Sequence, residues 1–172
     1  MAKTLSFPVL LDRLQQDFPT FSFEAGEAYC WSPSDKRIVY KRADSGSTAV
    51  YSLLHELGHA LLDHKHYHLD FELLDLEVAA WQKACQVAPE YHVAIDGDHI
   101  QDCLDTYRDW LYGRSICPSC DTKTLQHDSS DHHNPNYRCY NCHATWNVTP
   151  SRFCRPYRSR QAKTDSSAPV FA

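Results

Sequence analysis

The spacing of apolar residues along the chain predicts four helices, separated by loops and one β-rich stretch. The helices are expected at residues 5–18, around His55 after the loop "DSGST", at 70–87 and at about 98–112. The stretch "FSFEAGEAYCWSPSDKRIVYKR" contains two β-rich runs around "SPSD", a turn composition that predicts a hairpin or a small antiparallel sheet. The pattern therefore predicts an α+β fold in which a small antiparallel sheet packs on three to four helices.

The helix around His55 separates into an apolar and a polar face when residues 50–63 are projected at about 100° per residue. The polar face carries His55, Glu56 and His59, in the arrangement His-Glu-x-x-His. Histidines at this spacing project in the same direction, so both imidazoles can reach one ion, and the glutamate between them can contact a water on that ion. A solvated, histidine-rich face is the alternative, and the apolar stripe behind the motif disfavours it.

Glu77 interrupts an otherwise apolar face of the third predicted helix. A carboxylate in a core is costly unless it is paired or binds a metal, and a catalytic zinc usually has three protein ligands and one water. Glu77 is therefore the predicted third ligand of a catalytic zinc, beside His55 and His59. The alternative is a salt bridge to a buried arginine or lysine. Glu72 and Asp75 are weaker candidates because they lie on the polar face of the same helix.

This ligand set predicts metal-assisted hydrolysis of a peptide bond. Glu56 is the predicted general base, which accepts a proton from the activated water and passes it to the leaving nitrogen. Tyr51, Tyr67 and His68 are candidates for stabilising the oxyanion. Three histidines close behind the motif are interpreted as a helix end, where imidazolium interacts favourably with the helix dipole, and one of them is a candidate for lining the cleft. They are His64, His66 and His68.

Two other zinc-protease patterns fit less well. The metzincin pattern requires glycine and histidine at positions that Leu62 and Lys65 occupy here. SprT-like proteases place a third histidine further downstream, but no histidine lies between Leu69 and Tyr91, so only His68 could take that role.

The segment "KRIVYKRADSGSTAVYSLLHELGHALLDH", followed by "LDLEVAAWQKA", resembles the ImmA/IrrE family of gluzincin-type metallopeptidases over roughly residues 5–112. The resemblance implies that His55, His59 and Glu77 are the zinc ligands and that Glu56 is the catalytic base. It also implies a protein substrate, because members of this family typically act in bacterial or phage regulation by cleaving a helix-turn-helix repressor. The chain differs from the family in having "EVAAW" where Glu-Ala-Asn or Glu-Ala-Asp is common, and in carrying a C-terminal module that the shortest members lack.

That C-terminal module contains two cysteine pairs, "CPSC" and "CYNC", with 18 residues between them. The spacing is typical of a zinc ribbon, in which four cysteines bind a structural zinc. The predicted ligands are Cys117, Cys120, Cys139 and Cys142. Because the intervening residues are too polar for a core, the metal is expected to hold this module together. A redox role for either pair is the alternative, disfavoured because no thioredoxin-like βαβ pattern surrounds them.

The two parts of the chain carry opposite charge. Residues 1–113 contain 9 Lys+Arg against 18 Asp+Glu, a net charge of −9, whereas residues 114–172 contain 8 against 4, a net charge of +4. The basic excess lies mainly in "SRFCRPYRSRQAK", whose arginines are Arg152, Arg155, Arg158 and Arg160. Arginines neutralise phosphates and the aromatic rings beside them can stack on bases, so this segment is a candidate contact for nucleic acid or a protein partner. A solubilising tail is the alternative.

The sequence as a whole predicts a cytoplasmic enzyme with two zinc ions, one catalytic and one structural. No membrane span or signal peptide is recognised, and paired cysteines in a reducing compartment favour metal binding over disulfides. The expected organisation is a metallopeptidase domain at 1–113, a zinc ribbon with a basic extension at 114–160 and a disordered tail at 161–172. The leading function is a zinc metalloendopeptidase that cleaves a regulatory protein. An SprT-like DNA-associated protease and a non-enzymatic zinc-ribbon adaptor for nucleic acid or protein are the alternatives, and no pattern sets the oligomeric state.

Overall fold

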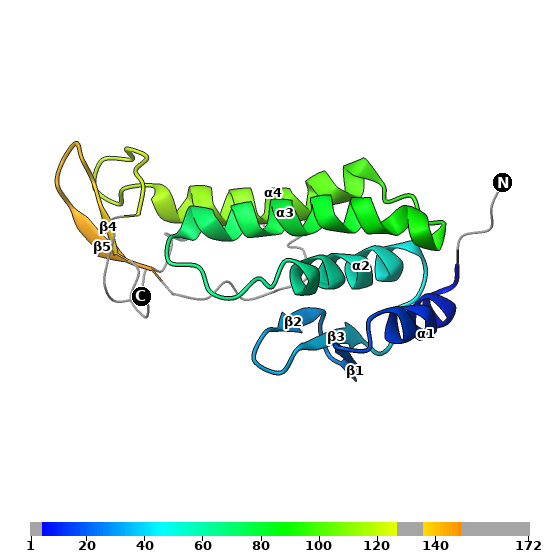
Figure 1. Cartoon of the computed structure of the whole chain (residues 1–172). Coiled ribbons are helices and arrows are strands. Elements are labelled where there is room, and N and C mark those ends of the chain that lie inside the picture. The colour runs from blue at the N-terminus through cyan, green and yellow to red at the C-terminus, as the bar shows by residue number, and fades with distance from the viewer. Residues whose placement is uncertain (1–4, 127–135, 149–172) are drawn as a thin grey trace. The chain divides into compact units, whose positions relative to one another are not determined.

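The computed structural model describes residues 5–126 and 136–148 (Figure 1). In this part of the chain, four α-helices and a 3₁₀ helix accompany a three-stranded and a two-stranded sheet, which confirms the predicted α+β class. The elements in chain order are α1 Phe7–Asp17, β1 Ser22–Gly26, β2 Cys30–Ser32, β3 Arg37–Lys41, α2 Ser47–Leu61, α3 Asp70–Val87, the 3₁₀ helix Ala88–Tyr91, α4 Gly97–Ser115, β4 Asn136–Arg138 and β5 Thr145–Asn147. None of the described helices combines the length and the apolar character that crossing a membrane requires.

The helices lie where the apolar spacing predicts them. α3 has the predicted bounds, and α2 begins at Ser47, inside the "DSGST" segment that was predicted as the loop before it. α1 begins later than predicted, with Pro8 in its first turn, where a missing backbone N–H costs nothing. α4 continues to Ser115, whose hydroxyl donates to the carbonyl oxygen of Tyr112 at 2.9 Å.

The three-stranded sheet has the order β1-β3-β2 and is mixed, so the prediction of an antiparallel sheet is wrong for one of its two pairings. β2 and β3 form the expected antiparallel hairpin, with Trp31 opposite Ile38. β1 pairs with the other edge of β3 in parallel, with Phe23 opposite Ile38. The chain reverses once between β1 and β2 and again between β2 and β3, so β3 runs in the direction of β1. A strand pattern shows which face is buried, not which neighbour a strand takes.

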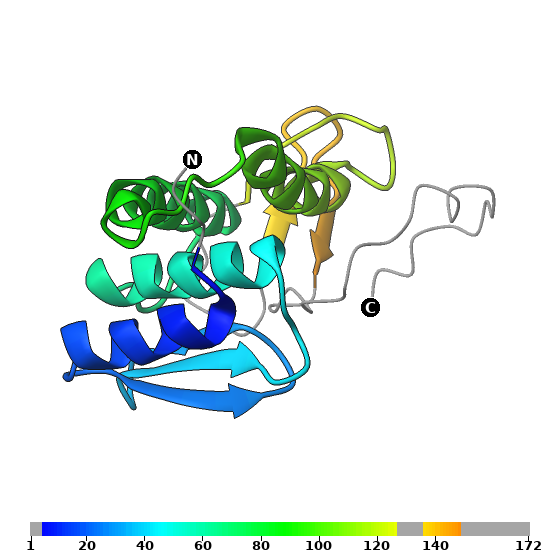
Figure 2. The same ribbon diagram turned by 90° about the vertical axis from the view of Figure 1, so that its right-hand side faces the viewer.

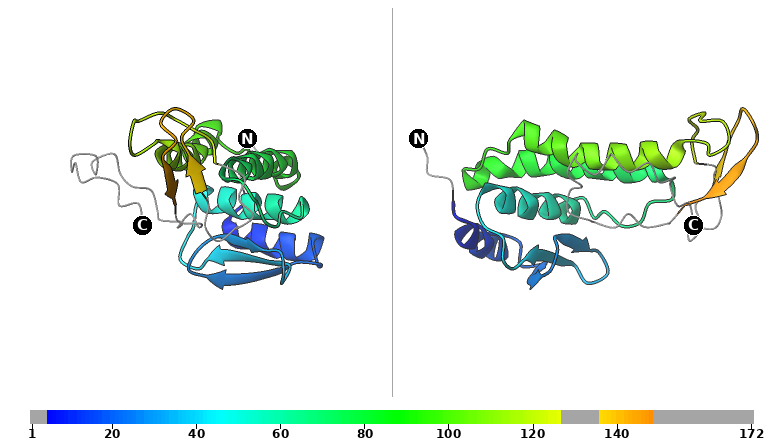
Figure 3. Two further views of the ribbon diagram at one scale, coloured as in Figure 1. Left: turned by 90° about the vertical axis from the view of Figure 1, so that its left-hand side faces the viewer. Right: turned by 180° about the vertical axis from the view of Figure 1, so that it is seen from behind.

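α1 and α2 lie on the same face of this sheet, and α2 lies between the sheet and α3 (Figure 2, Figure 3). The side chains between these layers include the apolar stripe predicted for α2. The branched aliphatic side chains that are at most 2% exposed are Leu10, Leu14, Ile38, Val50, Leu53, Leu54 and Leu57. Each large apolar side chain buried in this way contributes about 1.5–3 kcal/mol. This core fixes the opposite, polar face of α2 toward α3.

The chain divides into two compact units. The first comprises residues 1–66 and 73–102 and contains the three-stranded sheet, α1 and α2. The second comprises residues 67–72 and 103–172, and its described part contains β4, β5 and both cysteine pairs. The domain boundary predicted near Gly113 stays a prediction.

Candidate metal centres

Three side chains from two helices converge in the first unit: His55 and His59 from α2, and Glu77 from α3. His55 Nε2 lies 3.0 Å from Glu77 Oε2 and 3.1 Å from His59 Nε2, and His59 Nε2 lies 3.6 Å from Glu77 Oε1. His55 and Glu77 are buried, at 8% and 6% exposed. The structure therefore brings together the three residues predicted as ligands of the first zinc.

Glu77 is held by the two histidines alone among the described residues, since no arginine or lysine there pairs with it. Burial would raise the pKa of Glu77, but the hydrogen bonds from His55 and His59 and the charges of these rings outweigh burial and keep the pKa below its ordinary value. For His59 the directions are reversed. Burial would lower the pKa of its imidazole, but the hydrogen bond with Glu77 and the negative charges of Glu77 and Glu56 raise this pKa above its ordinary value. The salt bridge to a buried arginine or lysine, considered as the alternative, is absent from the described residues.

The donor set suits a divalent metal ion. Two imidazole nitrogens and one carboxylate oxygen are typical ligands of a zinc site that keeps one exchangeable position. The Nε2 atoms of His55 and His59 lie 3.1 Å apart, and both nitrogens point toward the carboxylate of Glu77. A shared cation would satisfy both nitrogens and the carboxylate together. The group could therefore hold a metal ion.

Aromatic side chains pack behind His55. Trp81, one turn after Glu77 on α3, stacks on the His55 ring, with the ring centroids 4.2 Å apart and 29° between the ring planes. His99, near the start of α4, contacts Trp81 and Tyr51 at centroid distances of 5.6 and 5.3 Å. Because Trp81 is buried, this packing fixes the orientation of the His55 ring.

Glu56 lies between the two histidines on α2 and is partly buried. Burial raises the pKa of its carboxyl group, although the charges of His55 and His59 and a hydrogen bond from the backbone N–H of Trp31 oppose this effect. A raised pKa suits a carboxylate that must accept a proton and then return it. The surroundings of Glu56 fit a general base, and its catalytic role stays a prediction.

Two contacts at the end of α2 are not foreseen by the sequence. The Nδ1 atoms of His59 and His64 lie 2.8 Å apart, and the indole N–H of Trp31 donates to the carbonyl oxygen of His64 at 2.9 Å. His64 does lie just beyond the helix end, as interpreted from the sequence. Burial lowers the pKa of its imidazole, however, which disfavours an imidazolium at the helix dipole. The short spacing from His59 to His64 was the one signal available, and nothing in the sequence pointed to Trp31.

The candidates for stabilising an oxyanion belong to different parts of the structure. Tyr51 lies one turn before His55 on α2 and contacts His99. Tyr67 and His68 belong to the second unit. Their proposed participation in the reaction stays a prediction.

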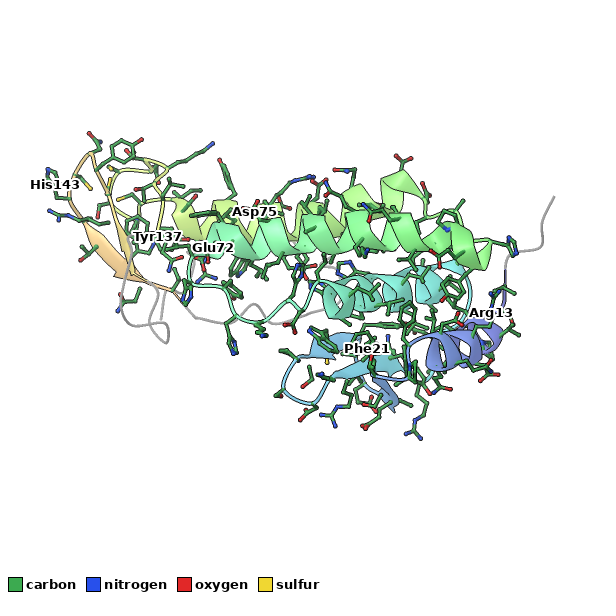
Figure 4. The ribbon with its side chains drawn as sticks, in the orientation of Figure 1. Arg13, Phe21, Glu72, Asp75, Tyr137 and His143 are labelled. Carbon is green, nitrogen blue, oxygen red and sulfur yellow. The ribbon has the colours of Figure 1, made fainter. Side chains whose placement is uncertain are left out.

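Glu72 and Asp75, the weaker ligand candidates, do not join the group around Glu77. The carboxylate of Glu72 accepts hydrogen bonds from the backbone N–H groups of Leu69 at 3.0 Å and His68 at 2.6 Å, and these bonds lower its pKa. Glu72 therefore caps the start of α3, and Asp75 is exposed (Figure 4).

The second unit contains the four-cysteine group. Cys117 Sγ lies 3.5 Å from Cys142 Sγ, and Cys120 Sγ lies 3.6 Å from Cys139 Sγ. A disulfide requires about 2.05 Å, so these are thiols that converge without bonding to one another. Backbone N–H groups of Ser119 and of Cys142 donate to the sulfurs of Cys117 and Cys139, at 3.4 and 3.5 Å. The group could hold a metal ion, as its spacing predicts.

A small buried core accompanies the cysteines, although the sequence led us to expect that the metal alone holds this module. Tyr137 and Trp146 stack with their ring centroids 5.5 Å apart and 17° between the ring planes. The hydroxyl of Tyr137 donates to buried Asp70, which also pairs with Nε of Arg114 at 2.7 Å. Burial raises the pKa of Asp70, and these two partners oppose it. The indole N–H of Trp146 donates to the carbonyl oxygen of Arg114 at 3.0 Å.

Several predicted features lie outside the described residues. They are Arg152, Arg155, Arg158, Arg160 and the tail at 161–172. No family model, curated protein or solved structure matches the chain. The two converging groups are thus the observations from which we infer a function.

Proposed function

We propose that the chain is a zinc-dependent metalloendopeptidase of the gluzincin type. The observation that carries this proposal is the convergence of His55, His59 and Glu77 on the helix face that also bears Glu56. Two histidines and a carboxylate as ligands, with a glutamate between the histidines as base, form a chemically complete set for hydrolysis by a metal-activated water. The burial of Glu77 without an arginine or lysine partner among the described residues supports a bound cation.

Each residue has a separate task in this proposal. Nε2 of His55, Nε2 of His59 and a carboxylate oxygen of Glu77 would hold the zinc ion. When bound, zinc lowers the pKa of a water molecule and polarises the carbonyl of the scissile peptide. Glu56 accepts the proton of the attacking water on its carboxylate and returns it to the leaving nitrogen.

The proposed substrate is a protein, and a helix-turn-helix repressor is the leading candidate. The support for this choice is the resemblance of the "HELGH" and "LDLEVAAW" segments to the ImmA/IrrE family. A specific protein substrate would also give the C-terminal module a purpose, since zinc ribbons and basic segments can bind protein or nucleic acid.

For the cysteine group we propose a structural zinc in a zinc-ribbon module. Four thiolates complete a tetrahedral zinc site and leave no position for water, so this ion would stabilise the module without taking part in hydrolysis. The sulfur separations and the small core around Tyr137 support such a closed site.

Cleavage of a partner in cells tests the enzymatic proposal. The chain is co-expressed with regulators encoded next to its gene, and the regulators are followed by mass spectrometry. We expect a cleaved regulator with the wild type and none with Glu56→Gln, while both proteins retain zinc because Glu56 is not a ligand. Glu90→Gln changes an exposed glutamate in the same unit and should leave cleavage unchanged. A product that forms equally well with Glu56→Gln would contradict the proposal.

A non-enzymatic zinc adaptor is the second candidate, favoured by the cysteine group. On that account the histidine–glutamate group would serve stability alone, and neither the wild type nor Glu56→Gln would cleave a regulator. An SprT-like protease is less favoured, because a carboxylate from α3 lies beside the two histidines where that reading needs a further histidine.

A further inference from the structure

We infer that His64 is a positioning residue that orients the zinc ligand His59, and that Trp31 holds His64 in place; the inference rests on the proposed function. The rings of His59 and His64 face each other through their Nδ1 atoms, 2.8 Å apart, with 73° between the ring planes. Nε2 of His59, the other ring nitrogen, lies toward His55 and Glu77. His64 thus contacts His59 at the nitrogen that the metal does not use.

The geometry determines which nitrogen carries each ring hydrogen. When neutral His59 binds a metal through Nε2, its hydrogen is on Nδ1. Nδ1–H of His59 therefore donates to Nδ1 of His64, and His64 carries its own hydrogen on Nε2. An outer hydrogen bond of this kind fixes the orientation of the ligating ring and makes its free nitrogen a stronger ligand.

The backbone of His64 is held on both sides. Its N–H donates to the carbonyl oxygen of His59 at 3.1 Å, and its carbonyl oxygen accepts from the indole of Trp31 at 2.9 Å. Trp31 lies on β2, and its ring packs edge-on against Phe21 with centroids 5.4 Å apart. The backbone N–H of Trp31 also donates to the carboxylate of Glu56. One strand residue therefore contacts both the proposed base and the residue behind His59.

His55 offers a comparison within the same group. Its Nδ1 atom is buried and has no hydrogen-bond partner among the described residues. On this side of the ring, the stacked indole of Trp81 packs against His55 in place of a hydrogen bond at Nδ1. Among the described residues, His59 therefore has a hydrogen-bond partner at the ring nitrogen away from the metal, namely His64, and His55 has none at the corresponding nitrogen.

Zinc affinity tests the role of His64 without requiring a substrate. The affinity is measured by competition with a chromophoric chelator. Glu77→Ala removes a ligand of the histidine–glutamate group, so its titration curve gives the zinc binding of the cysteine group alone. His64→Leu removes the acceptor nitrogen Nδ1 and puts an apolar side chain of similar size in its place. His64→Asn keeps an acceptor close to the position of Nδ1. His66→Leu is the matched control, because His66 is an exposed histidine two residues further along the chain.

We expect zinc binding about 10–100-fold weaker in His64→Leu, and affinities within about threefold of the wild type in His64→Asn and His66→Leu. Wild-type affinity in His64→Leu, or a loss in His64→Asn as large as that in His64→Leu, would overturn the inference. Identical curves for the wild type and Glu77→Ala would overturn it together with the proposed function. A normal dependence on His64 in a protein that cleaves no regulator would overturn the proposed function alone.

Discussion

Gly58 of α2 lies so close to α3 that a Cβ atom on it would be 2.4 Å from the carbonyl oxygen of Ala80. Glycine in the middle of a helix costs about 1 kcal/mol relative to alanine, so its presence needs a reason. The close approach of the two helices is that reason, because it lets Glu77 reach His55 and His59. The close packing of α2 against α3 at Gly58 therefore also brings the three candidate metal ligands together.

Gly58→Ala should lower stability in spite of the better helix propensity of alanine. The added methyl group meets backbone, which cannot rotate away, so we expect a loss of about 1–3 kcal/mol in the free energy of unfolding. Chemical denaturation measures this loss, and the chelator competition should show weaker zinc binding by the same variant. Gly113→Ala is the control, since nothing lies within 4 Å of a Cβ at that position of α4. It should be neutral or stabilising by about 0.5–1 kcal/mol, and an equal effect of both substitutions would contradict the packing account.

Tyr137→Phe should destabilise the second unit. The substitution removes the hydroxyl that donates to buried Asp70 and leaves that carboxylate with less compensation for its burial. We expect a loss of about 1–3 kcal/mol in the free energy of unfolding, measured by urea denaturation. Tyr140→Phe makes the same chemical change at a side chain that is 71% exposed and should alter stability by less than about 0.5 kcal/mol. If the two variants have the same stability, the contact with Asp70 does not contribute.

Loss of the cysteine-bound metal should disorder the packing of the second unit. In Cys139→Ser the tetrahedral set is incomplete, and the small core around Tyr137 and Trp146 is too limited to fold by itself. We expect one zinc ion fewer per chain and a weaker near-ultraviolet circular dichroism signal from the stacked rings. Cys85→Ser changes an exposed thiol outside the group and should leave both measurements unchanged. An unaltered spectrum in Cys139→Ser would show that the core does not depend on metal.

The sequence was sufficient to predict the helices and both candidate metal centres, for a physical reason. Amphipathic helices bury one face, so apolar spacing locates them, and the bounds predicted for α3 match the structure. The same periodicity places Glu77 on a buried face of α3, and the residue is 6% exposed in the structure. The cysteine spacing was equally informative, because two short knuckles can bring four sulfurs together with little help from the rest of the chain.

The spacing of residues along the chain does not predict contacts between segments that are distant in the sequence. The parallel pairing of β1 with β3 depends on strand order, which alternating residues do not encode. The contact of Trp31 with His64 joins a strand to the end of a helix, and neither residue has a local signature for it. Asp70 looked like an ordinary helix start, and its burial with Arg114 and Tyr137 follows from tertiary packing alone.

The most direct test of the central claim is the zinc content of purified protein, determined by elemental analysis of the wild type and Glu77→Ala. Asp75→Ala, which changes an exposed carboxylate on the same helix, is the matched control. We predict about two zinc ions per chain in the wild type and in Asp75→Ala, and about one in Glu77→Ala, in line with the two groups of converging ligands. Equal zinc content in all three proteins would contradict a metal centre built from His55, His59 and Glu77.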